Sequence, residues 1–193
     1  GNTCPALFIG RCLMGGQRMS DKGACLALLL CIGCGPGGGS TSEKALIEHG
    51  RWEAVAPEVD PFFEDAVGAE VCGVGDYAVE GAGDAAYFEV DTTDCNYLTV
   101  SQPSLARIEV GDTLQWTWWH LPLSAQEYGE AVIELRIAER TIFTRSIAIP
   151  AEEAVYSPTI IADFSIPAGS PVFFNLHNHG ANSWRFHSFT VAP

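Results

Sequence analysis

The sequence predicts an all-β domain over residues 85–193, an antiparallel β-sandwich or jelly roll with Greek-key connections. Short segments rich in Val, Ile, Thr, Tyr, Phe and Trp follow one another there, separated by Gly, Pro and Asp. Apolar and polar residues alternate within several segments, as in a strand with one buried face. No helical periodicity interrupts the series, which favours antiparallel sheets.

The strand pattern can be assigned to particular segments. The expected ranges are 87–91, 97–100, 106–110, 113–121, 131–138, 141–149, 159–165 and two more from residue 172 onward. Alternation is clearest where Ile133, Leu135 and Ile137 alternate with Glu134 and Arg136. Roughly 110 residues of this pattern are enough for one domain with a well-buried core.

The chain before residue 85 is expected to have three parts. Residues 1–34 contain an upstream extension and an export signal, and residues 35–42 form a flexible Gly-rich linker. Residues 43–84 are expected to form a short helix at 43–55, capped by Ser42, and then an irregular acidic segment.

The apolar run GACLALLLCIGC, which ends at Cys34, predicts export. Arg18 and Lys22 precede it, and the run is too short for a membrane span of roughly 20 residues. Its end resembles the lipobox of bacterial lipoproteins, although Cys31 stands where leucine is usual. That resemblance implies a lipid on Cys34, membrane attachment and a location in the bacterial cell envelope, on the outer membrane or its periplasmic face. Secretion without a lipid is the alternative.

Two cysteines, Cys72 and Cys95, remain in the expected mature domain. Cysteines of exported domains usually pair, so a disulfide is predicted, with a stabilisation of about 3 kcal/mol from chain entropy. The chain carries a formal net charge of −14. That charge excludes nucleic acid as a favoured partner.

Histidines near the C-terminus indicate a candidate metal site. His177 and His179 are two residues apart on an expected strand, so both project from one face, about 7 Å apart at their bases. Such a pair can bind copper or zinc. A third ligand would be His120, at the end of the 113–121 strand, or His187. The alternative is that these histidines are separately hydrogen-bonded residues at a packed rim.

The position of His187 depends on strand register. A hairpin around residues 180–183 would pair His179 with Trp184 and place His187 on the apolar face with Phe189 and Val191. A register shifted by one residue would instead bring His187 beside the pair. Apolar patterning favours the first arrangement.

Known catalytic motifs are not found in the sequence. It has no G-x-S-x-G elbow and no glycine-rich phosphate loop in a suitable context. No cysteine follows Cys95, which argues against a blue-copper centre. The WWH strand and the HNHGANSW segment make the chain similar to uncharacterised bacterial lipoproteins, a resemblance that implies no activity. The sequence therefore leans against an enzyme.

A binding surface is the leading functional interpretation. Trp119 is expected to be exposed, because Trp116 and Trp118 alternate with it on the apolar side of the strand. Exposed tryptophans can stack on sugar rings. Trp119, Trp184, Asn182 and Arg185 are the candidate ligand-binding residues. We therefore expect an exported, non-catalytic binding domain for a small ligand or glycan, with a carbohydrate-binding module or a mononuclear copper or zinc protein as alternatives.

Overall fold

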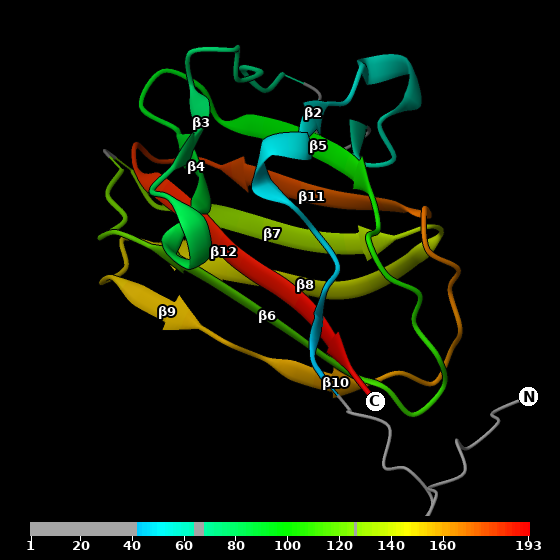
Figure 1. The fold of residues 1–193 in the computed structure, drawn as a ribbon. Coiled ribbons are helices and arrows are strands. Elements are labelled where there is room, and N and C mark those ends of the chain that lie inside the picture. Colours follow the sequence, from blue (N-terminus) through cyan, green and yellow to red (C-terminus); the bar gives the residue numbers. More distant parts are fainter. Residues whose placement is uncertain (1–41, 64–67, 126) are drawn as a thin grey trace, which may run out of the picture. The chain divides into compact units, whose positions relative to one another are not determined.

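A computed structural model describes residues 42–63, 68–125 and 127–193. These residues form two antiparallel sheets packed face to face, without an α-helix in the described part (Figure 1). The predicted β-sandwich is confirmed. Within the same residues, no helix has the length and apolarity needed to cross a membrane. The expected export signal, Cys34 and almost all of the 35–42 linker lie outside the described residues.

The sandwich consists of a seven-stranded and a five-stranded sheet. In the seven-stranded sheet the order is β10 (Thr159–Ile161), β6 (Thr113–His120), β12 (Ser183–Ala192), β4 (Tyr87–Asp91) and β3 (Tyr77–Glu80), while β1 (Lys44–Ala45) also pairs with β12 and β9 (Ala154–Tyr156) with β6. In the five-stranded sheet the order is β2 (Glu53–Ala54), β5 (Tyr97–Pro103), β11 (Pro171–Asn178), β7 (Gly129–Ile137) and β8 (Arg140–Ile149). Short 3-10 turns occur at η1 (His49–Arg51), η2 (Pro57–Val59) and η4 (Gly83–Ala85).

The core lies between the two sheets and follows the alternation of the sequence. On β11 the predicted apolar face, formed by Val172, Phe174 and Leu176, is buried. Phe174 stacks on Phe186 of β12 in the opposite sheet, with ring centroids 4.9 Å apart. Burial of these large side chains, at roughly 25 cal/mol per Å² of apolar surface, is the main force holding the sheets together.

The segment expected to be a helix, 43–55, forms β1, η1 and β2 instead. Its backbone bonds go to distant strands: the Leu46 N–H donates to the Phe189 carbonyl, and the Leu46 carbonyl accepts from the Leu105 N–H. Leu46 and Trp52 are both buried in the core. Tertiary pairing therefore overrides a weak local preference for helix.

Two further expectations about strands were wrong. Residues 106–110 form no strand, and Ile108 makes only an isolated bridge to Ile166. The segment expected to be irregular contains β3, which pairs with β4 at the edge of the seven-stranded sheet. The two sheets thus include three strands, β1, β2 and β3, that precede residue 85.

The final two strands do not form the expected hairpin. β11 lies between β5 and β7, whereas β12 lies between β6 and β4 in the other sheet (Figure 1). Residues 179–182 therefore cross from one sheet to the other. Gly180 permits this crossing, because a Cβ at this position would lie 2.6 Å from the Ser124 carbonyl oxygen. Both apolar faces can then point into the same core.

Candidate functional site

Trp119 lies on the outer face of the seven-stranded sheet, half-buried, because both of its neighbours on β6 point into the core. Arg185 of β12 is its cross-strand partner, and the guanidinium carbon lies 5.4 Å from the centroid of the indole. The same guanidinium lies 5.0 Å from the Tyr87 ring centroid, and its Nε lies 3.2 Å from Oε2 of Glu89. These contacts hold Arg185 beside the tryptophan.

A cavity of about 340 Å³ opens next to this tryptophan. We call it the Trp119 pocket. Its lining residues are Trp119, His120, Leu121, Glu153, Ala154, Val155 and Arg185. The volume lies within the range of about 300–1,000 Å³ that is typical of small-ligand sites. The pocket combines an aromatic wall and the exposed Val155 with the hydrogen-bond donors of Arg185 and the carboxylate of Glu153.

His187 lies beside the Trp119 ring, outside the core. Their ring centroids are 6.4 Å apart and the planes are almost parallel, at 12°. The expected inward position of His187 was wrong, because a β-bulge between Phe186 and Ser188 shifts the register there. Nε2 of His49, in η1, lies 2.9 Å from the His187 carbonyl oxygen, and burial lowers the pKa of His49.

His120 and Trp184 lie on the opposite, inner face of the same two strands. They are directly paired in register, each is 1 % exposed, and their ring centroids are 5.0 Å apart. Nδ1 of His120 bonds to the Leu121 carbonyl oxygen at 2.8 Å, and burial lowers the pKa of the imidazole. The Asn182 side chain donates to the same carbonyl at 2.8 Å. Of the four candidate ligand-binding residues, only Trp119 and Arg185 therefore line the pocket, while Trp184 is part of the core.

His177 and His179 project from the outer face of the five-stranded sheet. Their ring centroids are 4.5 Å apart, so the two side chains lie close together on the same face of the sheet. A cavity of about 360 Å³ lies there, lined by Glu130, Val132, Glu134, Asn175, His177 and His179. The expected third ligand was wrong, because His120 is in the core and His187 lies on the outer face of the other sheet.

Tyr97 of β5 closes one side of this histidine pair. It is the register partner of His177, and the two rings meet edge to face with centroids 5.8 Å apart. Its hydroxyl donates to Oδ2 of Asp60 at 2.8 Å and accepts from Oγ1 of Thr99 at 3.1 Å. Burial raises the pKa of Tyr97, so the phenol stays protonated and keeps donating to Asp60.

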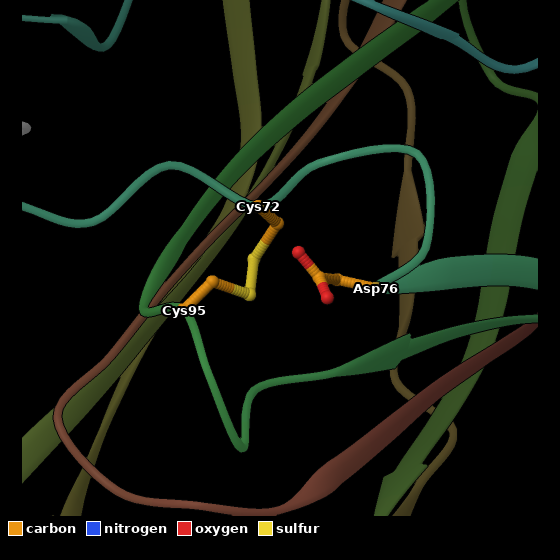
Figure 2. A group of neighbouring side chains, drawn as sticks. All are labelled: Cys72, Asp76 and Cys95. Carbon is orange, nitrogen blue, oxygen red and sulfur yellow. A yellow bond between two sulfur atoms is a disulfide. The ribbon is translucent and has the colours of Figure 1, made fainter.

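Among the described residues, one group of three potential metal ligands has all its ligand atoms within 4.8 Å of one another: Cys72, Asp76 and Cys95 (Figure 2). The two sulfurs form the predicted disulfide, with the Cα atoms 5.0 Å apart. The Asp76 carboxylate accepts a hydrogen bond from the Gly73 N–H at 2.7 Å. Because a thiolate is the form of cysteine that binds metal, this group is a structural cross-link rather than a metal centre.

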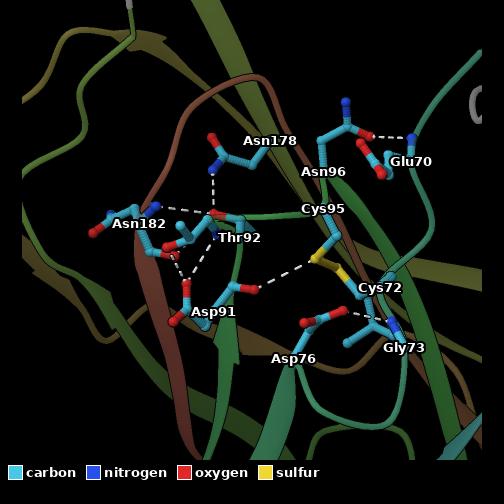
Figure 3. The surroundings of a disulfide bond; sticks show 12 residues. Glu70, Cys72, Gly73, Asp76, Asp91, Thr92, Cys95, Asn96, Asn178 and Asn182 are labelled. Atoms are coloured by element: carbon cyan, nitrogen blue, oxygen red, sulfur yellow. Dashed lines mark hydrogen bonds between the residues drawn. A yellow bond between two sulfur atoms is a disulfide. The ribbon is translucent and has the colours of Figure 1, made fainter.

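A buried polar network beside the disulfide holds the crossing segment in place (Figure 3). The Asn178 amide donates to Oγ1 of Thr92 at 2.7 Å, and that hydroxyl donates to the Asn182 carbonyl at 2.8 Å. The Asn182 N–H returns to the same Oγ1 at 3.1 Å. This network ties the end of β11, and with it His179, to the residues that follow β4.

Sequence reasoning missed several residues of both outer faces. Alternation in 87–91 would place Tyr87 and Glu89 on one side of a strand, but nothing local shows that β12 lies between β4 and β6. Likewise, Glu130 and Glu134 are on the wet face of a clearly alternating strand, yet their position beside the histidines depends on the β7 and β11 pairing. Only sheet order brings these residues together.

No family model matches the sequence, and no curated protein matches it. Among solved structures, TmCBM27, a carbohydrate-binding module that recognises mannan, aligns with a TM-score of 0.44 and 9 % identity over 78 % of this chain and 94 % of that one. TmCBM61, solved with β-1,4-galactotriose, aligns with a TM-score of 0.41 and 11 % identity over 75 % of this chain and 89 % of that one. An α-L-arabinofuranosidase bound to arabinose aligns with a TM-score of 0.43 and 12 % identity over 80 % of this chain and 27 % of that one. At these scores the similarities support no argument about function.

Proposed function

We propose that this protein is an exported, lipid-anchored, non-catalytic domain that binds carbohydrate in the Trp119 pocket. The observation that carries the proposal is the half-buried indole at the wall of a cavity of about 340 Å³, with the Arg185 guanidinium 5.4 Å from its centroid. Sugar rings present an apolar C–H face and a rim of hydroxyls. An aromatic surface flanked by hydrogen-bonding groups matches both features.

The polar groups of the pocket suit hydroxyl recognition. Arg185 offers donors in a fixed direction, because Glu89 and Tyr87 orient its guanidinium. Glu153, on the other side of the pocket, is exposed and offers two acceptor oxygens. A hydroxyl that both donates and accepts can be satisfied between them. The ligand would be one or a few sugar units, since the site is a pocket of limited volume.

Binding is favoured over cleavage by the acidic groups around the pocket. Glycosidases generally use two carboxylates on either side of the scissile bond. Among the residues lining the pocket, Glu153 is the one carboxylate, and the nearby Glu89 is paired with Arg185. We therefore assign the pocket to recognition.

The sequence signal and the disulfide support export. The 23–34 run has the apolar core and small residue of a secretory signal, Arg18 and Lys22 form the charged flank before it, and its end resembles a lipobox at Cys34. The Cys72–Cys95 disulfide fits an oxidising compartment, because cytosolic thiols are kept reduced. A lipid on Cys34 would attach the domain to a membrane, and the Gly-rich 35–42 segment would give it reach.

A glycan array tests the recognition proposal. We expect the purified protein to bind a limited set of glycans and Trp119→Ala to lose at least about tenfold in affinity, or about 1.4 kcal/mol, for the best of them. Trp119→Phe should retain part of the binding, because it keeps an aromatic face. Tyr128→Ala removes an aromatic side chain that is 93 % exposed elsewhere and serves as the matched control. An array without hits, or equal losses in Trp119→Ala and Tyr128→Ala, would contradict the proposal.

Mass spectrometry of the mature N-terminus tests the anchor. In a bacterial host that processes lipoproteins, we expect a chain that starts at Cys34 and carries a diacylglyceryl group. Cys34→Ser should abolish the modification while leaving the fold unchanged. An unmodified Cys34 in an exported protein would replace the anchor with simple secretion.

A further inference from the structure

Two imidazoles lie together on the outer face of the five-stranded sheet, at the end of its central strand. β11 lies between β5 and β7; His177 projects from it, and His179 follows directly after its last residue and lines the same cavity. Their ring centroids are 4.5 Å apart and their planes differ by 47°. Rings at this separation can each direct one nitrogen to a common point about 2 Å away, while the other nitrogen keeps a hydrogen bond.

The neighbouring strand places a carboxylate beside this pair. Val132 of β7 is the register partner of His177, and the His179 N–H donates to the Glu130 carbonyl oxygen at 3.2 Å. Glu130 thus lies across from His179, and facing residues on adjacent strands have Cβ atoms about 5 Å apart. Its side chain is exposed and makes no hydrogen bond or ion pair among the described residues, so it can rotate.

The rest of the cavity favours a cation. Glu134 lies on the same face, where its Oε1 accepts from Oγ1 of Thr144 at 2.8 Å, and Asn175 adds an amide. No basic side chain is among the residues that line the cavity in the described part of the chain. The formal net charge of −14 strengthens the attraction for positive ions.

The residues around the pair leave space for His179, and several of their polar groups are already hydrogen-bonded. A Cβ at residue 129 would lie 3.2 Å from the His179 Cβ, so the glycine there gives the histidine room. The Tyr97 hydroxyl, on the other side of the pair, already donates to Asp60 and accepts from Thr99. The Thr92–Asn178 network fixes the backbone immediately before His179. Apart from Glu134, whose Oε1 is bonded to Thr144, the side chains of metal-ligand type that line the cavity are the two imidazoles and the Glu130 carboxylate.

We propose that His177, His179 and Glu130 form a mononuclear site for a divalent transition-metal ion, with Zn²⁺ or Cu²⁺ as the fitting ions. Two imidazoles and a carboxylate are a known ligand set for Zn²⁺, and imidazole also suits Cu²⁺. As they stand, the three ligand atoms are not all within 4.8 Å of one another, so the Glu130 side chain rotates inward on binding. Water completes the coordination. The site does not rest on carbohydrate binding, which is proposed for the opposite sheet.

Calorimetric titration of the full chain with ZnCl₂ and CuCl₂ tests the site. Free cysteines are first alkylated without reductant, because the chain has seven cysteines and Cys72–Cys95 accounts for only two of them. We expect one ion per chain, with Cu²⁺ bound more tightly than Zn²⁺. His177→Gln, His179→Gln and Glu130→Gln should each weaken binding at least about tenfold, which corresponds to about 1.4 kcal/mol. His187→Gln and Glu153→Gln, on the other sheet, should bind as the parent does.

Several outcomes would overturn the assignment. Absence of stoichiometric binding, or an equal loss in His187→Gln, would overturn the site itself. Unchanged binding by Glu130→Gln would overturn the three-ligand set. Equal thermal midpoints of the variants without added metal show that they fold. Glycan binding should be retained in His179→Gln, which shows that the metal site and the Trp119 pocket are separate. A failure of the carbohydrate proposal would instead be seen as unchanged glycan binding in Trp119→Ala.

Discussion

The two faces of the seven-stranded sheet place similar residues in opposite roles. On the inner face His120 and Trp184 are paired and each is 1 % exposed, whereas on the outer face the next pair along the same strands, Trp119 and Arg185, borders a cavity. Each pair joins an indole to a nitrogen-rich side chain. The two pairs differ only in the face of the sheet to which their side chains point, because successive residues of a strand point to opposite faces. The face to which a residue points, which alternates along a strand, therefore decides more than residue type whether such a pair stabilises the core or can contact a ligand.

The largest expected effect is on stability, when the inner and the outer tryptophan are each replaced by alanine. Trp184→Ala should lower the free energy of unfolding by about 3–5 kcal/mol, because it leaves a cavity between Trp118, His120 and the opposite sheet. Trp119→Ala should cost less, about 1–2 kcal/mol, since its ring lies on the outer face and is only partly buried. Urea denaturation of both variants measures the difference. Equal losses would show that the outer tryptophan is structural as well.

A smaller effect is expected at the outer pair when its charge is removed. Arg185→Gln leaves Glu89 without its partner at a site where the two side chains are 25 % and 19 % exposed. We expect a loss of about 1 kcal/mol in stability, because the ion pair is lost. Glycan binding should also weaken, because the pocket loses the donors of the guanidinium. Glu89→Gln is the matched variant. If it weakens glycan binding while Arg185→Gln does not, the arginine has no part in recognition.

The smallest effect is expected in the pH dependence of stability. Burial lowers the pKa of His120 below its usual value near 6.5, so the unfolded chain takes up the proton first as the pH falls. The free energy of unfolding should therefore decrease below about pH 6.5, until the pH reaches the lowered pKa of the folded state. His49, whose pKa is also lowered by burial, contributes with the same sign.

Two variants test which histidines cause this pH dependence. His120→Gln and His49→Gln should each flatten part of the slope of stability against pH below about pH 6.5, because each removes a histidine whose pKa burial lowers. Denaturant unfolding at a series of pH values gives the slopes. A slope that both variants keep in full would contradict the assignment.

Local alternation predicted much of what each strand does. The buried rows Leu114, Trp116 and Trp118 on β6, and Val172, Phe174 and Leu176 on β11, follow directly from a period of two. The same reasoning placed Trp119 outside and brought His177 and His179 together. The Cys72–Cys95 disulfide followed from the number of cysteines left after the export signal. Export itself remains an expectation drawn from the sequence.

Contacts between segments that are distant in the chain could not be predicted from the sequence. Backbone bonds between residues far apart in the chain produce three features. These are the bulge at His187, the separation of β11 from β12, and the pairing of β1 with β12 and of β2 with β5. These bonds and the shared core outweigh local preferences, which are small for short segments. By itself, the sequence determined the faces of the strands, because alternation is local. Only the tertiary structure decided which faces meet, and so placed Arg185 beside Trp119 and Glu130 beside His179.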